Sequence, residues 1–190
     1  MLVRSLSVLA LVLAPVVARA ADEEHPYKSA KVGDFATYKM TTKVAGINVN
    51  GTMTQTVTEK SDKEATVKAS MSIEVNGQKQ DIPAQEQKID LTKPFDPTKA
   101  ANLPDGAEAK IEKGKEGKEK VKVGGKEYST TWTEYTAKMK VMGQELDAKI
   151  KTWTAKDVGA GGMVKMTMTA SIAGQDMEVL MELTESGNKK

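Results

Sequence analysis

A glycine-containing turn recurs at a fixed spacing along the chain. Gly46 and Gly77 lie 31 residues apart, and Gly143 and Gly174 repeat that interval. The four contexts are Val44-Ala45-Gly46-Ile47, Val75-Asn76-Gly77-Gln78, Val141-Met142-Gly143-Gln144 and Ile172-Ala173-Gly174-Gln175. A two-residue hairpin needs a positive φ, which glycine adopts without steric cost. We therefore interpret each context as the turn of a β-hairpin.

The spacing also predicts an internal repeat. Laying residues 33–82 on residues 130–179 without a gap gives nine identical positions, among them Tyr38 with Tyr135 and Met71 with Met168. Fixed-period self-similarity is the sequence signature of a repeated unit. The alternative is convergence, because hairpins rich in lysine and threonine share residues by composition. We predict two pseudo-repeats, at about 33–92 and 127–185.

The runs between the turns alternate apolar and polar residues, which is the period of a half-buried strand. Threonine and lysine occupy the outer positions, as expected for a sheet with one solvated face. Outside residues 1–20 the sequence predicts no helix. We predict an all-β fold, an antiparallel meander of about 8–10 strands in two related halves, forming a curved sheet or a closed barrel. A sandwich is left open.

Residues 93–126 lie between the predicted repeats and are predicted to form a polar hairpin. Prolines make the first part irregular, and residues 113–120 are a lysine and glutamate run that holds two glycines. One interpretation is a mobile cover over a cavity, and the other is a solvated hairpin tip.

Residues 1–20 have the pattern of a cleaved signal peptide. Arg4 precedes an apolar run, and Ala18-Arg19-Ala20 matches a cleavage site. The run is too short to span a bilayer, so no transmembrane anchor is expected. We predict cleavage after Ala20, an exported protein that is periplasmic or extracellular, and a single all-β domain over residues 21–190. Residues 22–26 are predicted to be a loose arm.

Charge and composition exclude several classes of function. Both arginines lie in the leader, which leaves 26 lysines against 26 acids. Without the guanidinium fork that favours phosphate and guanine, nucleic-acid binding is not expected. The chain has no cysteine and a single histidine, His25. No metal site, cofactor or catalytic constellation is therefore predicted, and the protein is not expected to be an enzyme.

Methionine is the notable residue of the predicted inner face. A methionine-rich surface is soft and adaptable, and it could line a cavity for a lipid or another apolar small molecule. The alternative is plain core packing, because small barrels are filled by their own side chains. The candidate ligand-lining residues are Tyr38, Met40, Met71, Tyr135, Met139, Met166, Met168, Met177 and Met181.

Two tryptophans fall out of phase with the inner rows. Trp132 and Trp153 are predicted on the outer, polar face, where exposed aromatic residues could mark a contact surface. The alternatives are that they sit beside a bulge or under residues 93–126.

The run Trp153-Thr154-Ala155-Lys156-Asp157-Val158, followed by Gly161-Gly162-Met163-Val164-Lys165, resembles a pattern in small secreted bacterial β proteins of uncharacterised function. Val32-Gly33-Asp34-Phe35 resembles their opening. Those proteins in turn resemble the LolA- and LppX-like lipoprotein-carrier half-barrels. That resemblance implies a concave apolar face that carries lipid. The carriers cover this face with helices, and no helix is predicted here.

From these observations we expect an exported, barrel-like binding module for a hydrophobic or lipid-like ligand. The alternative is a structural or protein-interaction module of the cell envelope with no small-molecule ligand. Its protein partner would be unknown.

Overall fold

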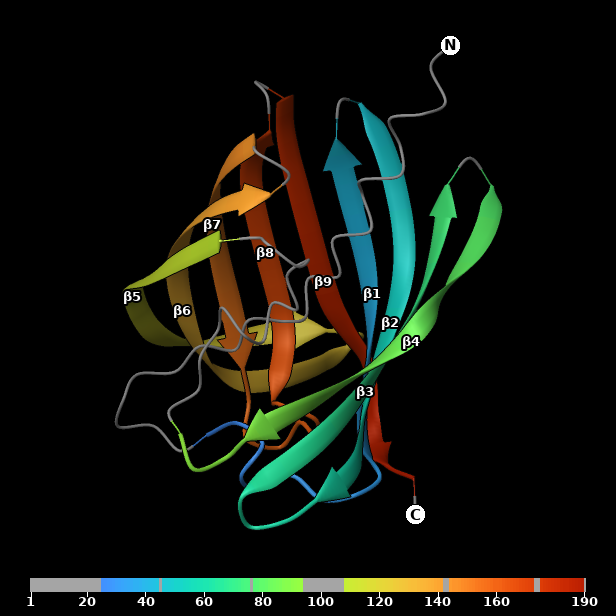
Figure 1. The fold of residues 1–190 in the computed structure, drawn as a ribbon, viewed down its shortest axis with the longest axis vertical. Coiled ribbons are helices and arrows are strands. Elements are labelled where there is room, and N and C mark those ends of the chain that lie inside the picture. The colour runs from blue at the N-terminus through green and yellow to red at the C-terminus, as the bar shows by residue number, and fades with distance from the viewer. Residues whose placement is uncertain are drawn as a thin grey trace.

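The computed structural model describes residues 25–44, 46–75, 77–93, 108–141, 144–172 and 175–189. Within this part the chain forms nine strands and no helix (Figure 1). The strands are β1 (Asp34–Val44), β2 (Ile47–Lys60), β3 (Glu64–Val75), β4 (Gln78–Asp90), β5 (Glu108–Val123), β6 (Lys126–Val141), β7 (Gln144–Thr154), β8 (Met163–Ile172) and β9 (Gln175–Asn188). The predicted leader, residues 1–20, lies outside the described residues.

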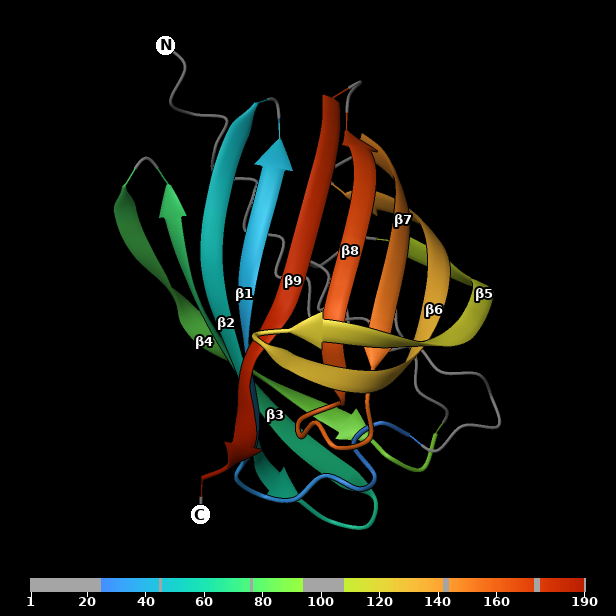
Figure 2. The same cartoon turned by 180° about the vertical axis from the view of Figure 1, so that it is seen from behind.

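The nine strands make one antiparallel sheet in the order β4-β3-β2-β1-β9-β8-β7-β6-β5. The first and last strands pair at its centre, and the chain meanders outward on both sides. Figures 1 and 2 show the sheet strongly curved, with β4 and β5 at its two edges. The predicted all-β antiparallel meander is confirmed. The sheet is open, so of the two predicted forms the curved sheet is observed and the closed barrel was wrong.

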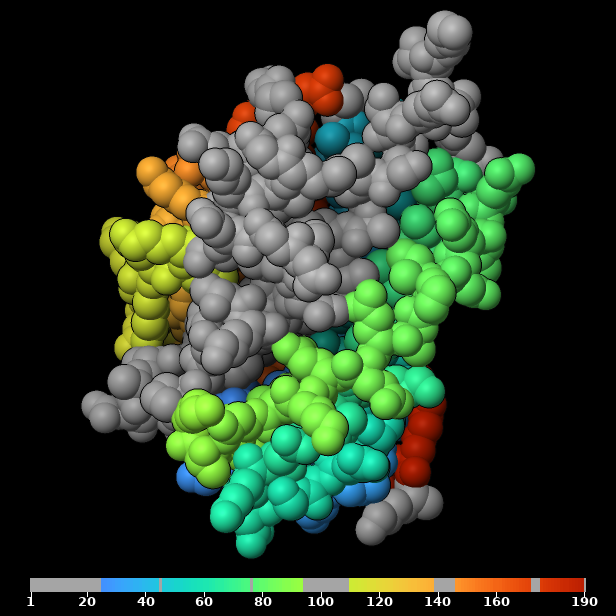
Figure 3. Space-filling view, viewed as in Figure 1, coloured from blue at the N-terminus to red at the C-terminus, as the bar shows by residue number. Residues whose placement is uncertain are grey.

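The exposed edge strand β4 gives the physical reason why the sheet stays open. Most β4 side chains are exposed, and the strand lies along the front of the molecule in Figure 3. It carries Lys79, Pro83 and Lys88, and proline cannot donate a ladder hydrogen bond while charges resist strand addition. An edge of this kind does not pair readily with a second edge.

The predicted turns fall where the sequence placed them. Each of the four predicted hairpins leaves two residues between its last paired positions, which are Val44 with Ile47, Val75 with Gln78, Val141 with Gln144, and Ile172 with Gln175. Gly46 and Gly77 have φ values of 79° and 78°, in the left-handed region that favours glycine.

The strand bounds also follow the offset of 97 residues that relates the predicted repeats. With that offset, the ends of β1 and β3 at Val44 and Val75 fall on Val141 and Ile172, the ends of β6 and β8. The starts of β2 and β4 fall on the starts of β7 and β9. The common origin of the halves stays a prediction.

The described part of residues 93–126 contributes the edge strand β5, and residues 94–107 lie outside the described residues. Residues 108–123 form β5, which pairs with β6 through a two-residue turn at Gly124 and Gly125. The alternation that predicts strands is weak here because β5 is an edge strand, exposed at most described positions. Its lysines and glutamates suit that position.

The hairpin of β5 and β6 bends across the outer side of β7 and β8, as Figure 2 shows. A β-carbon at Gly124 would lie 3.7 Å from the Leu183 carbonyl oxygen of β9, so the turn reaches the centre of the sheet. Val123 and Tyr128 are buried in the main hydrophobic cluster as a result. The hairpin therefore covers the outer face at this end.

Both tryptophans contact β5. Trp132 belongs to the hairpin itself and packs on Gly117, whereas Trp153 of β7 lies beneath the hairpin. The Trp153 indole N–H donates to Glu119 of β5, and Trp153 is only 9% exposed. Trp132 is half-buried, with the Lys151 ammonium 4.1 Å from its ring. Trp153 is therefore no exposed contact residue. It lies under β5 and also beside the bulge between Trp153 and Thr154, so both predicted alternatives hold for it.

Close packing of Trp132 on Gly117 leads to a prediction. A β-carbon at Gly117 would sit 2.7 Å from Trp132 Cζ2, whereas one at Gly114 would sit 3.3 Å from the Glu134 carbonyl oxygen. We expect Gly117→Ala to lower the free energy of unfolding by about 1–3 kcal/mol, and Gly114→Ala to lower it less. Urea unfolding of both variants measures the difference. Equal midpoints would show that the Trp132 ring does not pack on Gly117 as described.

Candidate functional site

The inner face of the curved sheet carries most of the hydrophobic cluster that the strands build. Strand pairing aligns its side chains in rows that cross the sheet. One row runs Met40, Met181, Met166 and Thr152, and the next runs Thr42, Val179, Met168, Ile150 and Tyr135. Alternation puts the lysines and threonines between them on the other face.

The sheet brings the predicted lining residues together on this face. Met40 is partly buried, and the Met139 side chain lies outside the described part. The others are buried in one hydrophobic cluster: Tyr38, Met71, Tyr135, Met166, Met168, Met177 and Met181. Met163 was missed, because a bulge between Trp153 and Thr154 shifts the pairing of β7 with β8 there. It is fully buried.

Most side chains of this face are buried, so the face is packed rather than open to solvent. The described part holds neither a helix nor a second sheet. The segment 25–33 and the loop 155–162 reach the cluster at one end of the sheet, through Tyr27, Val158 and Ala160. A sheet with one apolar face is stable only when that face is packed against something else.

Two buried polar atoms interrupt the inner face. The Tyr38 hydroxyl and Gln55 Oε1 have no hydrogen-bond partner among the described residues. They come from adjacent strands, because Gln55 pairs with Ala36, two residues from Tyr38 on the same face. Burial, and secondarily Tyr27, raise the pKa of Tyr38, so its hydroxyl stays protonated and can donate. Such atoms call for a water or a ligand group.

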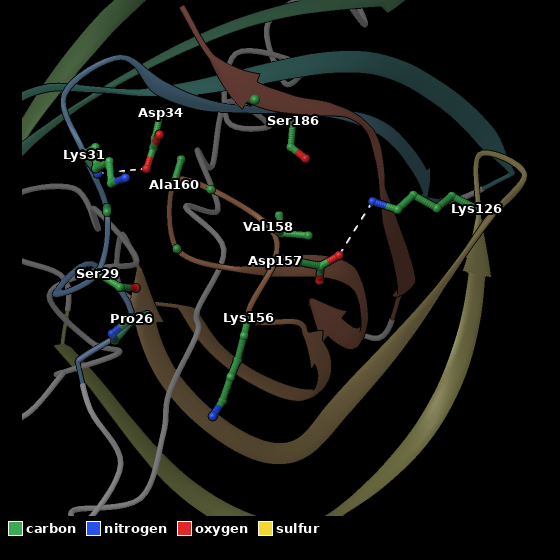
Figure 4. Close-up of a pocket in the computed structure, with 14 residues that line it drawn as sticks. Pro26, Ser29, Lys31, Asp34, Lys126, Lys156, Asp157, Val158, Ala160 and Ser186 are labelled. Atoms are coloured by element: carbon green, nitrogen blue, oxygen red, sulfur yellow. Dashed lines mark hydrogen bonds and ion pairs between the residues drawn. The ribbon is translucent and has the colours of Figure 1, made fainter.

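A polar pocket of about 340 Å³ lies at the end of the sheet where the loop 155–162 meets the segment 25–33 (Figure 4). A β-carbon on Gly161 would sit 2.9 Å from the Tyr27 hydroxyl oxygen, so this loop packs on the segment that enters the core. The side chains that line the pocket include Ser29, Lys31, Asp34, Lys126, Lys156, Asp157 and Ser186. No sequence pattern marks this pocket, since its residues come from four separate segments.

The sequence also misplaced the start of the fold. His25 was predicted in a loose arm, but it is buried, and the Tyr27 amide donates to its Nδ1 at 3.3 Å. Burial lowers the pKa of His25, and Asp90 opposes that shift. Tyr27, two residues on, is a core residue. The local sequence is polar, so no periodicity marks this anchor.

Among the described residues no cluster of histidine, cysteine, aspartate and glutamate could hold a metal ion. The same part contains no helix with the length and hydropathy needed to cross a membrane. The expectation that the protein is not an enzyme stays a prediction.

The unpaired Tyr38 hydroxyl leads to a second prediction. A buried hydroxyl without a partner costs free energy of folding, so its removal should relieve that cost. We expect Tyr38→Phe to raise the free energy of unfolding by about 1 kcal/mol in ligand-free protein. Chemical denaturation measures the change. A loss of stability of similar size would show that the hydroxyl is hydrogen-bonded in solution.

No protein-family model matches the sequence, and no curated protein matches it. The fold is similar to that of a predicted exported protein with a YmcC-like fold from Bacteroides fragilis, at 9% identity and a TM-score of 0.50, over 84% of this chain and 97% of that chain. A predicted lipoprotein from Parabacteroides distasonis gives 9% identity and a TM-score of 0.48, over 83% and 96%. At such identity the first likeness shows a shared all-β fold alone. Neither is a LolA or LppX structure, so that resemblance stays a prediction.

Proposed function

We propose that the protein is an exported binding module whose inner face takes a hydrophobic, lipid-like ligand. The observation that carries the proposal is the methionine-rich inner face of a single curved sheet, whose side chains gather in one hydrophobic cluster. An apolar ligand would enter between these flexible side chains, because they are already nearly fully buried.

The chemistry of the face suits a flexible ligand. Met166, Met168 and Met181 are nearly fully buried side by side on neighbouring strands. Unbranched thioether side chains adjust to irregular apolar shapes better than branched ones do. The Tyr38 hydroxyl and Gln55 Oε1 would meet a polar group of the ligand, which adds orientation to an otherwise apolar surface.

Export is part of the proposal. The first 20 residues have the charge and hydropathy pattern of a cleaved leader, and the Bacteroides fragilis neighbour is itself described as exported. An exported protein could bind an apolar compound outside the cytoplasm and act as its carrier or sensor. The resemblance to lipoprotein carriers points to the same class of ligand.

The alternative is a structural or protein-interaction module of the cell envelope with a fully packed core. The complete burial of Tyr38, Met53 and Met181 is compatible with it. Of the two predicted surface-contact residues, only the half-buried Trp132 remains available to a partner. The charged and proline-bearing edge β4 resists strand addition, so that edge does not favour this alternative.

Met40 offers the sharpest test of the proposal. It is partly buried on the inner face, and its Cε lies 3.0 Å from where a β-carbon on Gly51 would be. We expect Met40→Trp to fill the adjoining space and reduce uptake of a dansylated fatty acid, measured by its fluorescence, on the order of tenfold. Thr41→Trp, on the outer face of the same strand, should bind the probe like the parent protein.

Circular dichroism of both variants ensures that the comparison is between folded proteins. The proposal would be overturned if the parent protein gave no saturable signal with the probe. It would also be overturned if the two variants lost binding equally, since binding would then not depend on the inner face.

A further inference from the structure

We propose that the pocket at the end of the sheet is an anion site for a phosphate-type oxyanion. Its walls are the segment 26–34, the loop 156–161, Lys126 of the β5–β6 turn, and Ser186 and Gly187 of β9. The pocket is polar and contains none of the inner-face methionines, so an anion can bind it whether or not an apolar ligand occupies that face. A volume of about 340 Å³ is at the small end of ligand pockets and suits a compact polar group.

Only one of the three lysines that line the pocket forms an ion pair with a carboxylate among the described residues. Lys126 lies 3.6 Å from Asp157, as the dashed line in Figure 4 shows. Within the described part of the chain, the ammonium groups of Lys31 and Lys156 have no carboxylate partner. Both lysines line the pocket, so an anion there would be attracted by two positive charges that no carboxylate of the described residues offsets.

The two carboxylates of the pocket are already engaged. Asp34 accepts hydrogen bonds from the Lys31 backbone N–H at 2.8 Å and from Asn188 Nδ2 at 2.8 Å. Asp157 faces Lys126. The pocket therefore has three ammonium groups and two carboxylates, and each carboxylate already interacts with a donor of the protein. The net charge of the pocket is positive, although the mature chain as a whole is expected to be neutral.

The loop adds backbone donors to this charge. Ala160, Gly161 and Gly162 have successive positive φ values of 49°, 98° and 78°, and Ala160 is the only described non-glycine residue with a positive φ. In the described structure the amides of Gly159, Ala160 and Gly161 donate no hydrogen bond. All three residues line the pocket, and Ala160 and Gly161 are buried.

Backbone amides of this kind need an acceptor, since buried N–H groups without one are rare. Successive amides in turn conformations form concave anion sites, and lysine supplies the point charge that phosphate binding uses. Ser29 and Ser186 add hydroxyl donors to the same cavity. The set of donors therefore matches a tetrahedral oxyanion without any arginine.

The phosphate could be a free ion or the headgroup of a lipid whose chains reach the inner face. Tyr27 and Val158 connect the two regions, since both belong to the hydrophobic cluster and flank the pocket or its loop. The two sources share one chemistry at the pocket. They differ in whether acyl chains add to the affinity, and this difference is measurable.

The test is a titration of the purified protein with inorganic phosphate at constant ionic strength, followed through amide resonances. We expect saturable shifts at Gly159, Ala160 and Gly161. In the double variant Lys31→Ala/Lys156→Ala the apparent affinity should fall on the order of tenfold. The matched control is Lys68→Ala/Lys79→Ala, which removes two exposed lysines from the opposite half of the sheet and should leave the affinity unchanged.

A second titration uses a short-chain phosphatidylglycerol below its micelle concentration. Affinity equal to that for phosphate supports a site for the free ion. Higher affinity that is lost in the Lys31→Ala/Lys156→Ala variant supports a headgroup site. The proposal is overturned if phosphate gives no saturable shift at the loop, or if both lysine pairs weaken binding equally. Failure here leaves the fatty-acid result on the inner face unaffected.

Discussion

Strict alternation of side chains across paired strands is the constraint on which the rest of this structure depends. Two-residue turns fix the pairing at Val44 with Ile47, and at three further hairpins. A shift of one residue in any of these registers would move a whole methionine row from the inner to the outer face. The register set by the turns therefore determines which face of the sheet is apolar. The proposal of a hydrophobic ligand depends on the methionines lying on that face.

The parts of the fold that the sequence predicts are those governed by local rules. Glycine at the second turn position and the period of two marked the hairpins, and the methionine rows followed from them. The ends were harder to predict. Tyr27 is buried because a distant loop with Gly161 leaves room for its ring, and nothing in the polar stretch around it shows that. Trp153 is covered by a hairpin 34 residues away in sequence, which alternation alone cannot reveal.

The same distinction holds for the candidate sites. The inner-face residues occupy alternate positions of strands in one sheet. Their common face could therefore be predicted from their spacing. The polar pocket collects Lys31, Lys126, Lys156 and Ser186 from four segments that share no pattern. Whether the inner face is a filled core or a binding surface depends on what packs against it, and sequence periodicity carries no information about that.

Native mass spectrometry of the protein purified from its own host tests the central claim most directly. The account predicts a discrete added mass of a few hundred daltons that disappears on denaturation, because an apolar compound would occupy the inner face. A bare protein mass under conditions that preserve the fold would contradict it. The inner face would then be a packed core, and the protein a structural or interaction module.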